Sequence, residues 1–230
     1  MGSLIDINAL LGQENAILTG THVVYTSGKH GSAYVDKDAF GHKPTIKAQI
    51  GQALAWKIMT DYIGNTCNPD HLSENFLFIG PETYGRDYAL LAAINYNKYS
   101  DAQSEAIFCE VAEDRAFFSD KRNFDQLVSR RKIIYVDDIL NEASTYFKVK
   151  RLIEECGGEI VLVLAIINRQ PGKNTAKSLG VSKLIVLKEV DMEVYDSDAC
   201  PLCAINAPMR ERPGHGKEWL EKHPGYPKVE

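Results

Sequence analysis

The sequence predicts an α/β fold in which a parallel, twisted sheet is flanked by helices. Apolar runs alternate with segments of helical periodicity through the middle of the chain, as is typical of parallel sheets. The most hydrophobic run, residues 159–167, lacks the alternation of a half-buried strand and predicts a strand buried on both faces. With 230 residues, 44% of them hydrophobic, the chain is long enough for one compact domain with a sizeable core.

Charge and cysteine content exclude several function classes. The formal net charge of -5 gives no general attraction to nucleic acid or to anionic membranes. No apolar run approaches the length of a membrane span, and residues 1–6 lack the basic and apolar regions of a signal peptide. The five cysteines are an odd number and mostly scattered, which argues against a disulfide framework. We therefore expect a cytoplasmic protein with no nucleic-acid or membrane partner.

The first part of the chain predicts an arm and a hairpin. Residues 4–18 have the pattern of a short amphipathic helix, and residues 22–37 have that of two strands around a Ser-Gly-Lys-His-Gly turn. On the hairpin alone, Lys29 is interpreted as an ordinary exposed lysine in a surface turn. We expect the arm and hairpin to occupy residues 1–43, an α/β core residues 44–190, and a tail that packs on the core residues 191–230.

Within the core, each element has a local signal. Pro44 suits the start of a helix, and the glycines after Cys156 suit the end of another. The predicted helices cover 44–63, 87–95, 146–156 and 173–179, and the further predicted strands cover 76–79, 106–111, 132–136 and 183–188.

Two adjacent carboxylates, Asp137 and Asp138, follow the strand over 132–136. Small and polar residues 141–145 come next, and then a helix begins. A helix N-terminus offers unpaired N–H groups and a positive dipole to an anion, and carboxylates accept hydrogen bonds from a sugar diol. A ribose 5-phosphate fits such a site from end to end. Alternatively, the two aspartates only terminate the strand and cap the helix.

A second loop of similar form, Gly80–Arg86, follows the strand over 76–79 and precedes a helix. A glycine-bounded loop in this position is again an anion-binding geometry. Each loop strengthens the evidence from the other, and both fall at the carboxyl ends of strands, where ligands bind in parallel sheets.

These two loops carry a resemblance to type I phosphoribosyltransferases. The run around Asp137 resembles their motif for phosphoribosyl pyrophosphate (PRPP), in which two acids, two apolar residues and a loop of small residues follow an apolar strand. Gly80–Arg86 resembles their pyrophosphate loop, although Tyr84 stands in place of a glycine and its backbone must therefore avoid positive φ. Asn141 and Glu142 depart from the motif. The matching residues are Asp137, Asp138, Ile139, Leu140, Ala143 and Thr145.

Other segments are similar to orotate phosphoribosyltransferases in particular. The hairpin resembles their N-terminal hood over the nucleobase, and a tail with Cys200-Pro-Leu-Cys203 occurs in a shorter subgroup. The resemblance implies the type I phosphoribosyltransferase fold and transfer of ribose 5-phosphate from PRPP to orotate, which gives orotidine 5′-phosphate and pyrophosphate in pyrimidine biosynthesis. It also implies Mg²⁺ carried by PRPP without a direct protein ligand, and a homodimer.

The resemblance assigns roles to individual residues. Asp137 and Asp138 hold the ribose hydroxyls, and Lys121, in a charged segment that closes over PRPP and serves the neighbouring subunit, is the third candidate catalytic residue. Arg169 follows the strand over 159–167, where the family binds the carboxylate of orotate, and a guanidinium matches a carboxylate bidentately. The candidate substrate-binding residues are Lys29, Tyr34, Glu82, Thr83, Tyr84, Gly85, Arg122, Asn141, Glu142, Ala143, Ser144, Thr145 and Arg169.

Three alternatives stay open at this point. Glu142 places a carboxylate in a phosphate loop, which is compatible with a related binding or regulatory protein that has lost catalysis. The enzyme could also act on another nucleobase. A zinc site from Cys200, Cys203, His215 and His223 is conceivable, but the short segment between the cysteines and histidines is rich in proline and glycine.

Overall fold

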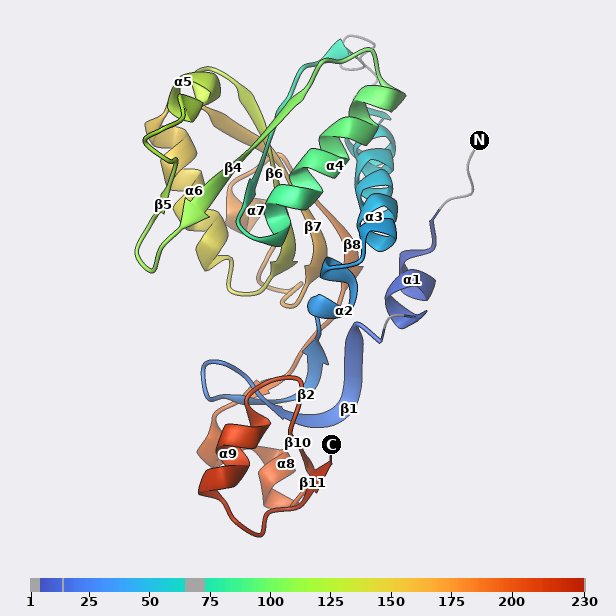
Figure 1. Cartoon of the computed structure of the whole chain (residues 1–230), viewed down its shortest axis with the longest axis vertical. Coiled ribbons are helices and arrows are strands. Elements are labelled where there is room, and N and C mark those ends of the chain that lie inside the picture. The colour runs from blue at the N-terminus through green and yellow to red at the C-terminus, as the bar shows by residue number, and fades with distance from the viewer. Residues whose placement is uncertain (1–4, 14, 65–72, 230) are drawn as a thin grey trace. The chain divides into compact units, whose positions relative to one another are not determined.

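The structure, a computed structural model, describes residues 5–13, 15–64 and 73–229. They form two compact units (Figure 1). The core unit contains Lys43–Val190 with the first described residues up to Ile7, and the terminal unit joins Asn8–His42 to the segment from Asp191 onward. The hairpin and the tail, which we had expected as separate parts, therefore belong to one unit. No described helix is long and apolar enough to cross a membrane.

The core unit contains a six-stranded sheet of order β5-β4-β3-β6-β7-β8. Five of these strands are parallel, and only the short β5 runs antiparallel to its neighbour. The predicted parallel α/β sheet is thereby confirmed. The strands are β3 (Leu77–Pro81), β4 (Glu105–Val111), β5 (Ala116–Phe117), β6 (Lys132–Leu140), β7 (Glu159–Asn168) and β8 (Lys183–Glu189).

The helices of the core unit connect these strands and cover the sheet. The first predicted helix, over 44–63, becomes α3 and a π-helical continuation over Ile58–Ile63. The α4 helix begins three residues earlier than predicted, whereas α7 begins three residues later. The helices are α3 (Pro44–Lys57), α4 (Tyr84–Tyr99), α5 (Phe124–Val128), α6 (Ser144–Glu155) and α7 (Ala176–Leu179).

Alternation along the strands directs side chains to two different helical layers. Phe76 and Phe78 contact the ring of Tyr96 in α4, at centroid distances of 5.7 and 5.9 Å. Leu77 and Ile79 point to the other face and belong to the buried cluster that includes residues of α6. Because successive side chains of a strand point to opposite faces, α4 and α6 cover opposite faces of the sheet.

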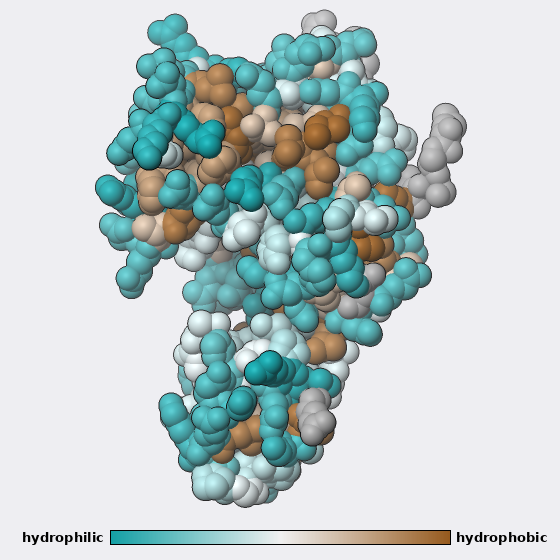
Figure 2. All heavy atoms as spheres, viewed as in Figure 1, coloured by the Kyte–Doolittle hydropathy of each residue, from teal (hydrophilic) through white to brown (hydrophobic). Residues whose placement is uncertain are grey.

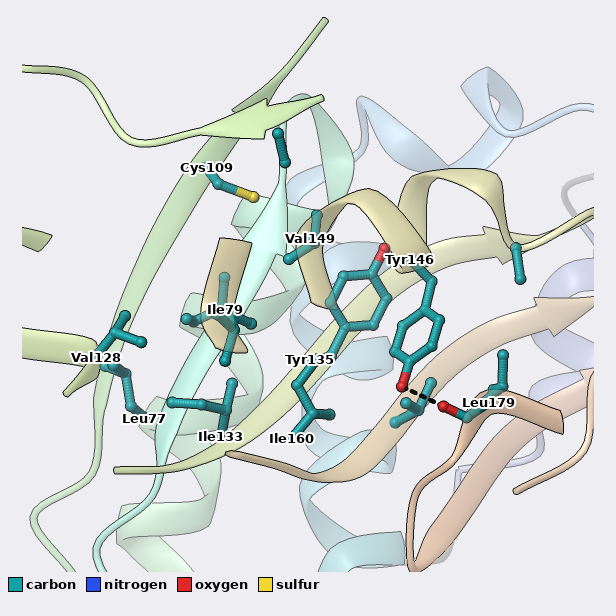
Figure 3. Packing of buried hydrophobic residues seen from close by; sticks show 14 of the residues in the cluster. Leu77, Ile79, Cys109, Val128, Ile133, Tyr135, Tyr146, Val149, Ile160 and Leu179 are labelled. Carbon is teal, nitrogen blue, oxygen red and sulfur yellow. Dashed lines mark hydrogen bonds between the residues drawn. The ribbon is translucent and has the colours of Figure 1, made fainter. Parts of the chain in front are cut away.

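The α6 side of the core is organised around two tyrosines (Figure 3). The rings of Tyr135 in β6 and Tyr146 in α6 meet edge to face at 5.2 Å. The Tyr146 hydroxyl donates to the Leu179 carbonyl at 2.9 Å, so no buried donor is left unpaired there. These contacts fix the first turn of α6 close to the carboxyl half of β6.

The two central strands differ in how well their extents were predicted. All of β7 except Glu159 is buried, which confirms the strand covered on both faces. By contrast, β6 continues through Asp137 and Asp138 to Leu140, so the expectation that the strand ends before the acidic pair was wrong. Parallel pairing carries it further, since Asp137 stands opposite Ala165 and Leu140 opposite Asn168 in β7.

The terminal unit contains a five-stranded sheet of order β11-β10-β1-β2-β9. The predicted hairpin is present as β1 and β2, and the later strands of the tail add to both of its edges. The strands are β1 (Ile17–Val24), β2 (His30–Val35), β9 (Val194–Tyr195), β10 (Met209–Arg210) and β11 (Lys228–Val229). The helices are α1 (Ile7–Gln13), α2 (Asp38–Gly41), α8 (Pro201–Ala204) and α9 (Gly216–Lys222).

The predicted helix over 4–18 was too long. The α1 helix ends at Gln13, Asn15 has a positive φ of 50°, and Ile17 already pairs with Val35 in the hairpin. A left-handed residue breaks the helical path, and the hydrogen bonds of the sheet then determine the backbone of residues 17 and 18.

Candidate active site

Three segments that were predicted to bind substrate leave the carboxyl ends of neighbouring strands. The Glu82–Gly85 loop follows β3, residues 141–145 follow β6, and Arg169 follows β7. Since β3, β6 and β7 are adjacent and parallel, these segments emerge at one edge of the sheet. The Arg169 backbone N–H donates to the Leu140 carbonyl at 2.8 Å, which ties the second and third segments together.

The loop after β6 forms the wall of a small cavity. Its volume is about 110 Å³, and it is lined by Asp137 and by residues 139–146. Ala143 has a left-handed backbone, with φ 54°, and α6 begins at the next residue. Because alanine carries no hydrogen-bonding side chain, the residue preceding the helix does not cap its first amides, which is the arrangement of an anion site.

Asp137 is buried beside this cavity, with only 7% of its surface exposed. The Tyr135 hydroxyl donates to Oδ2 at 2.6 Å, and the Asp138 backbone N–H donates to Oδ1 at 2.9 Å. Burial, and next the negative charge of Asp138, raise the pKa of the Asp137 carboxyl well above its ordinary value. A hydroxyl donor or a positive charge placed in the cavity would therefore stabilise the buried Asp137 carboxylate.

Asp138 points to the opposite face of the sheet, as alternation in β6 requires. Its Oδ1 accepts the Ile139 backbone N–H at 2.8 Å, and the side chain is also buried. Burial, and next the charge of Asp138, raise the pKa of the Tyr88 hydroxyl in α4. The acidic pair is thus divided between the two helical layers, and of the two aspartates only Asp137 lines the cavity.

The loop after β3 is held against β6 by two glycines. A Cβ on Gly80 would lie 2.0 Å from the carbonyl oxygen of Gly85, and a Cβ on Gly85 would lie 3.0 Å from the Val136 carbonyl oxygen. Only glycine permits backbone to approach backbone this closely. The pyrophosphate-type loop therefore packs on β6 immediately before Asp137.

Charged side chains surround the beginning of α4. Lys47 of α3 pairs with Asp87 at 2.5 Å and lies over the Tyr84 ring at 5.3 Å. Arg86 pairs with Glu82 at 3.6 Å across the first turn. Tyr84 is not among the residues with positive φ, so the backbone restriction expected from its side chain is confirmed.

The chain is similar in sequence to known orotate phosphoribosyltransferases. No protein-family model matches the chain. It is similar to the orotate phosphoribosyltransferase of Carboxydothermus hydrogenoformans, with 29% identity over 213 residues that cover 93% of this chain and 98% of that protein.

Solved structures extend this comparison to the fold. The orotate phosphoribosyltransferase of Aeropyrum pernix aligns with a TM-score of 0.57 and 16% identity over 80% of this chain and 93% of that one. The Mycobacterium tuberculosis enzyme in complex with PRPP aligns with a TM-score of 0.51 and 13% identity, over 80% of this chain and 89% of that one. The chain has the type I phosphoribosyltransferase fold.

In this phosphoribosyltransferase fold, the basic segment before α5 lies beside the outer strands β4 and β5. This segment contains Arg115, Lys121 and Arg122. Arg122 stacks over the rings of Phe108 and Phe124, at 5.4 and 5.5 Å, while Lys121 is exposed. Arg115 lies over the Phe117 ring at 5.9 Å. The aromatic contacts hold the Arg122 guanidinium against Phe108 of β4, whereas Lys121 is exposed to solvent.

Glu142 is exposed even though it lines the cavity. Solvent screens an exposed carboxylate, so its repulsion of a bound phosphate is much weaker than that of a buried group. Asn141, the other departure from the motif, is exposed as well, and its Oδ1 accepts a hydrogen bond from the Gln170 side chain at 3.3 Å.

A group of buried amides that sequence reasoning missed supports both loops. Asn168 is fully buried, and its Oδ1 accepts from Asn174 Nδ2 at 3.1 Å and from the Gln170 N–H at 3.1 Å. Asn174 Nδ2 also donates to the Asn141 carbonyl at 2.7 Å. The clustering of polar turn residues directly after the most hydrophobic strand was the available signal. This network positions the half-buried Arg169 next to residues 141–145.

Lys29 and Tyr34 belong to the terminal unit, whereas the other candidate residues belong to the core unit. Lys29 is exposed at the hairpin turn and pairs with Asp196 at 3.2 Å. Tyr34 is half-buried and stacks on Tyr25 with a centroid distance of 6.4 Å. Within their unit, the two residues are thus anchored on the hairpin that was predicted to form the hood.

Proposed function

We propose that the chain transfers ribose 5-phosphate from PRPP to orotate, giving orotidine 5′-phosphate and pyrophosphate. The observation that carries this proposal is the cavity between β6 and α6, which joins an uncapped helix start to the buried Asp137 carboxyl. This combination suits a 5′-phosphate attached to a sugar, because the amides attract the phosphate and the carboxyl group accepts the hydroxyls. The similarity to orotate phosphoribosyltransferases supports orotate as the acceptor.

The proposed mechanism relies on position and charge rather than on covalent catalysis. As pyrophosphate leaves, the ribose acquires positive charge near its anomeric carbon. Asp137, which lines the cavity, holds the ribose hydroxyls and stabilises that charge, and it does so with little reorganisation because it is fixed in β6. Asp138, the second candidate, is proposed to add negative charge from the other face of the strand. Residues 141–145 hold the 5′-phosphate at the start of α6.

The loop after β3 is proposed to bind the leaving pyrophosphate. The backbone of Glu82–Gly85 is proposed to hold it, while Lys121 and Arg122 neutralise its charge. Mg²⁺, which prefers oxygen ligands and retains several waters, would ride on the pyrophosphate of PRPP and add to this neutralisation. The exposed carboxylate of Glu82 in this loop suits the water shell of such an ion.

The base end of the site is assigned to Arg169, with Lys29 and Tyr34 as further contacts to PRPP or the base. Replacing Arg169 with Lys should raise KM for orotate about 10- to 100-fold, because the bidentate contact to the carboxylate is worth about 1.5–3 kcal/mol. The KM for PRPP should change far less. Steady-state kinetics with each substrate varied in turn measure the difference. Lys173→Ala, which removes an exposed cation from the same loop, is the matched control. An equal loss for both substrates would move Arg169 to the phosphate end.

The exposed Glu142 gives a test between an enzyme and a binding protein without catalysis. Glu142→Thr should tighten PRPP binding about fivefold or less, since two unit charges 4 Å apart in water repel by about 1 kcal/mol. The unmodified protein should already consume orotate. Calorimetric titration with PRPP and Mg²⁺, together with an orotate assay of both proteins, provides the comparison, and Glu155→Thr at the other end of α6 is the control. If the unmodified protein consumes no orotate and the Glu142→Thr variant binds PRPP, the regulatory function is favoured.

A homodimer acting in the cytoplasm completes the proposal. Large hydrophobic side chains are exposed on α3 and α4, namely Trp56, Leu90 and Ile94. Figure 2 shows the corresponding hydrophobic surface over α4. Burial of such a patch between two copies would remove apolar area from water, and the basic segment would then serve the neighbouring subunit.

A further inference from the structure

A compact group of metal-ligating side chains lies in the terminal unit, in a part of the chain that the proposed reaction does not use. His22 in β1, His30 at the start of β2, and Cys200 and Cys203 around the start of α8 place one potential ligand atom each within 4.8 Å of the others. Both histidines and Cys200 are buried, and Cys203 is half-buried. We propose that these four residues bind one structural Zn²⁺ ion.

Four of the six distances between the ligand atoms lie close to the edges of a tetrahedral zinc shell. His22 Nε2 lies 3.1 Å from His30 Nδ1, while the sulfur–nitrogen distances are 3.6 Å for Cys200–His22, 3.7 Å for Cys203–His22 and 3.2 Å for Cys203–His30. Bonds of about 2.05 Å to nitrogen and about 2.3 Å to sulfur give tetrahedral edges of about 3.3 Å between nitrogens and about 3.6 Å between sulfur and nitrogen.

The surroundings of the histidines favour the ligand form of their rings. His22 Nδ1 lies 3.0 Å from the Ala207 carbonyl oxygen and donates its proton there, so Nε2 carries the free lone pair. The His30 ring is held edge to face against Trp219 at 5.3 Å.

The charges of the site also balance. On binding, the two thiols lose their protons to solvent and form two sulfur–zinc bonds, so two thiolates and two neutral imidazoles surround a divalent cation. The resulting centre has no net charge, and burying it carries a smaller penalty than burying an isolated ion. Zinc is favoured over Mg²⁺ because the ligands are sulfur and imidazole nitrogen rather than oxygen.

With four protein ligands, the site has no open coordination position and is structural rather than catalytic. It would join the β1–β2 hairpin to the segment around α8, which comes from the other end of the chain. The terminal unit consists of two short chain segments, and units of that size commonly need a metal or disulfide in addition to their core. These ligands replace His215 and His223 of the earlier expectation; among the described residues those two do not belong to the cluster.

The test is the zinc content of the full-length protein purified without a histidine tag. The parent should contain about one zinc per chain, and His22→Asn and Cys203→Ser should lose most of it. His215→Asn, His223→Gln and Cys156→Ser should keep it, because these residues have the same chemistry but lie outside the cluster. Removing zinc with a chelator should lower the melting temperature of the parent, and adding Zn²⁺ should restore it.

A second measurement does not depend on variants that fold. Co²⁺ added to the zinc-free parent should give the strong visible bands of tetrahedral coordination and a thiolate-to-cobalt charge-transfer band. Zinc-free purified protein with no such spectrum would overturn the proposal. So would a Cys200–Cys203 disulfide found by mass spectrometry after alkylation without reductant, or zinc that disappears in His215→Asn or His223→Gln but persists in His22→Asn.

Discussion

Replacing Asp137 with Asn is expected to lower kcat about 100-fold or more and at the same time to stabilise the protein without ligand. The loss of activity follows because a fixed carboxylate beside the developing charge is replaced by a neutral amide. The gain in stability follows because the carboxyl is buried next to Asp138, which raises its pKa. Each unit of that shift corresponds to about 1.4 kcal/mol.

The gain in stability from Asp137→Asn depends on pH. An acid with a raised pKa holds its proton more tightly in the folded than in the unfolded state, so the parent loses stability as pH rises from about 4 toward the folded pKa. The Asn variant has no such loss. The difference in melting temperature between variant and parent should therefore grow as the pH rises above about 4, as measured by thermal unfolding without ligand. Asp101→Asn, at an exposed position before β4, is the control. A variant that is less stable than the parent at pH 8 would show that the carboxylate contributes to the scaffold instead.

The second large effect is expected at Gly80. A Cβ there would lie 2.0 Å from the carbonyl oxygen of Gly85, and no rotamer change can relieve a clash between backbone groups. Gly80→Ala should therefore reduce the free energy of unfolding by at least about 3 kcal/mol, the upper part of the range for overpacking. Because the displaced loop is the proposed pyrophosphate site, PRPP affinity should fall in any protein that remains folded.

Urea unfolding and calorimetric titration with PRPP measure the two consequences. Gly172→Ala is a suitable control, since a Cβ at Gly172 meets nothing within 4 Å and the residue has no positive φ. Its free energy of unfolding should change by less than about 0.5 kcal/mol. An unchanged urea midpoint for Gly80→Ala would mean that the loop can move away from Gly80 at little cost.

Much of the core unit could be predicted because its signals are local. The burial of β7 follows from an unbroken apolar run, and the start of α3 follows from Pro44. The positions of the loops after β3 and β6 followed as well, since a parallel sheet collects the carboxyl ends of its strands at one edge. The end of β6 could not be predicted, because pairing with β7, rather than the polarity of Asp137 and Asp138, decides where that strand stops.

Other features depend on contacts between residues far apart in the chain, which only the tertiary structure decides. Alternation in β6 sends Asp137 and Asp138 to opposite faces and puts Tyr135 on the face of Asp137. The presence of Tyr88 near Asp138 depends on the packing of α4, and the presence of Tyr146 near Tyr135 depends on the packing of α6. The sequence alone indicated a possible metal site from its Cys-x-x-Cys spacing. No local pattern could identify the histidines that complete this site. His22 precedes Cys200 by 178 positions, and the two residues come together only when β10 pairs with β1.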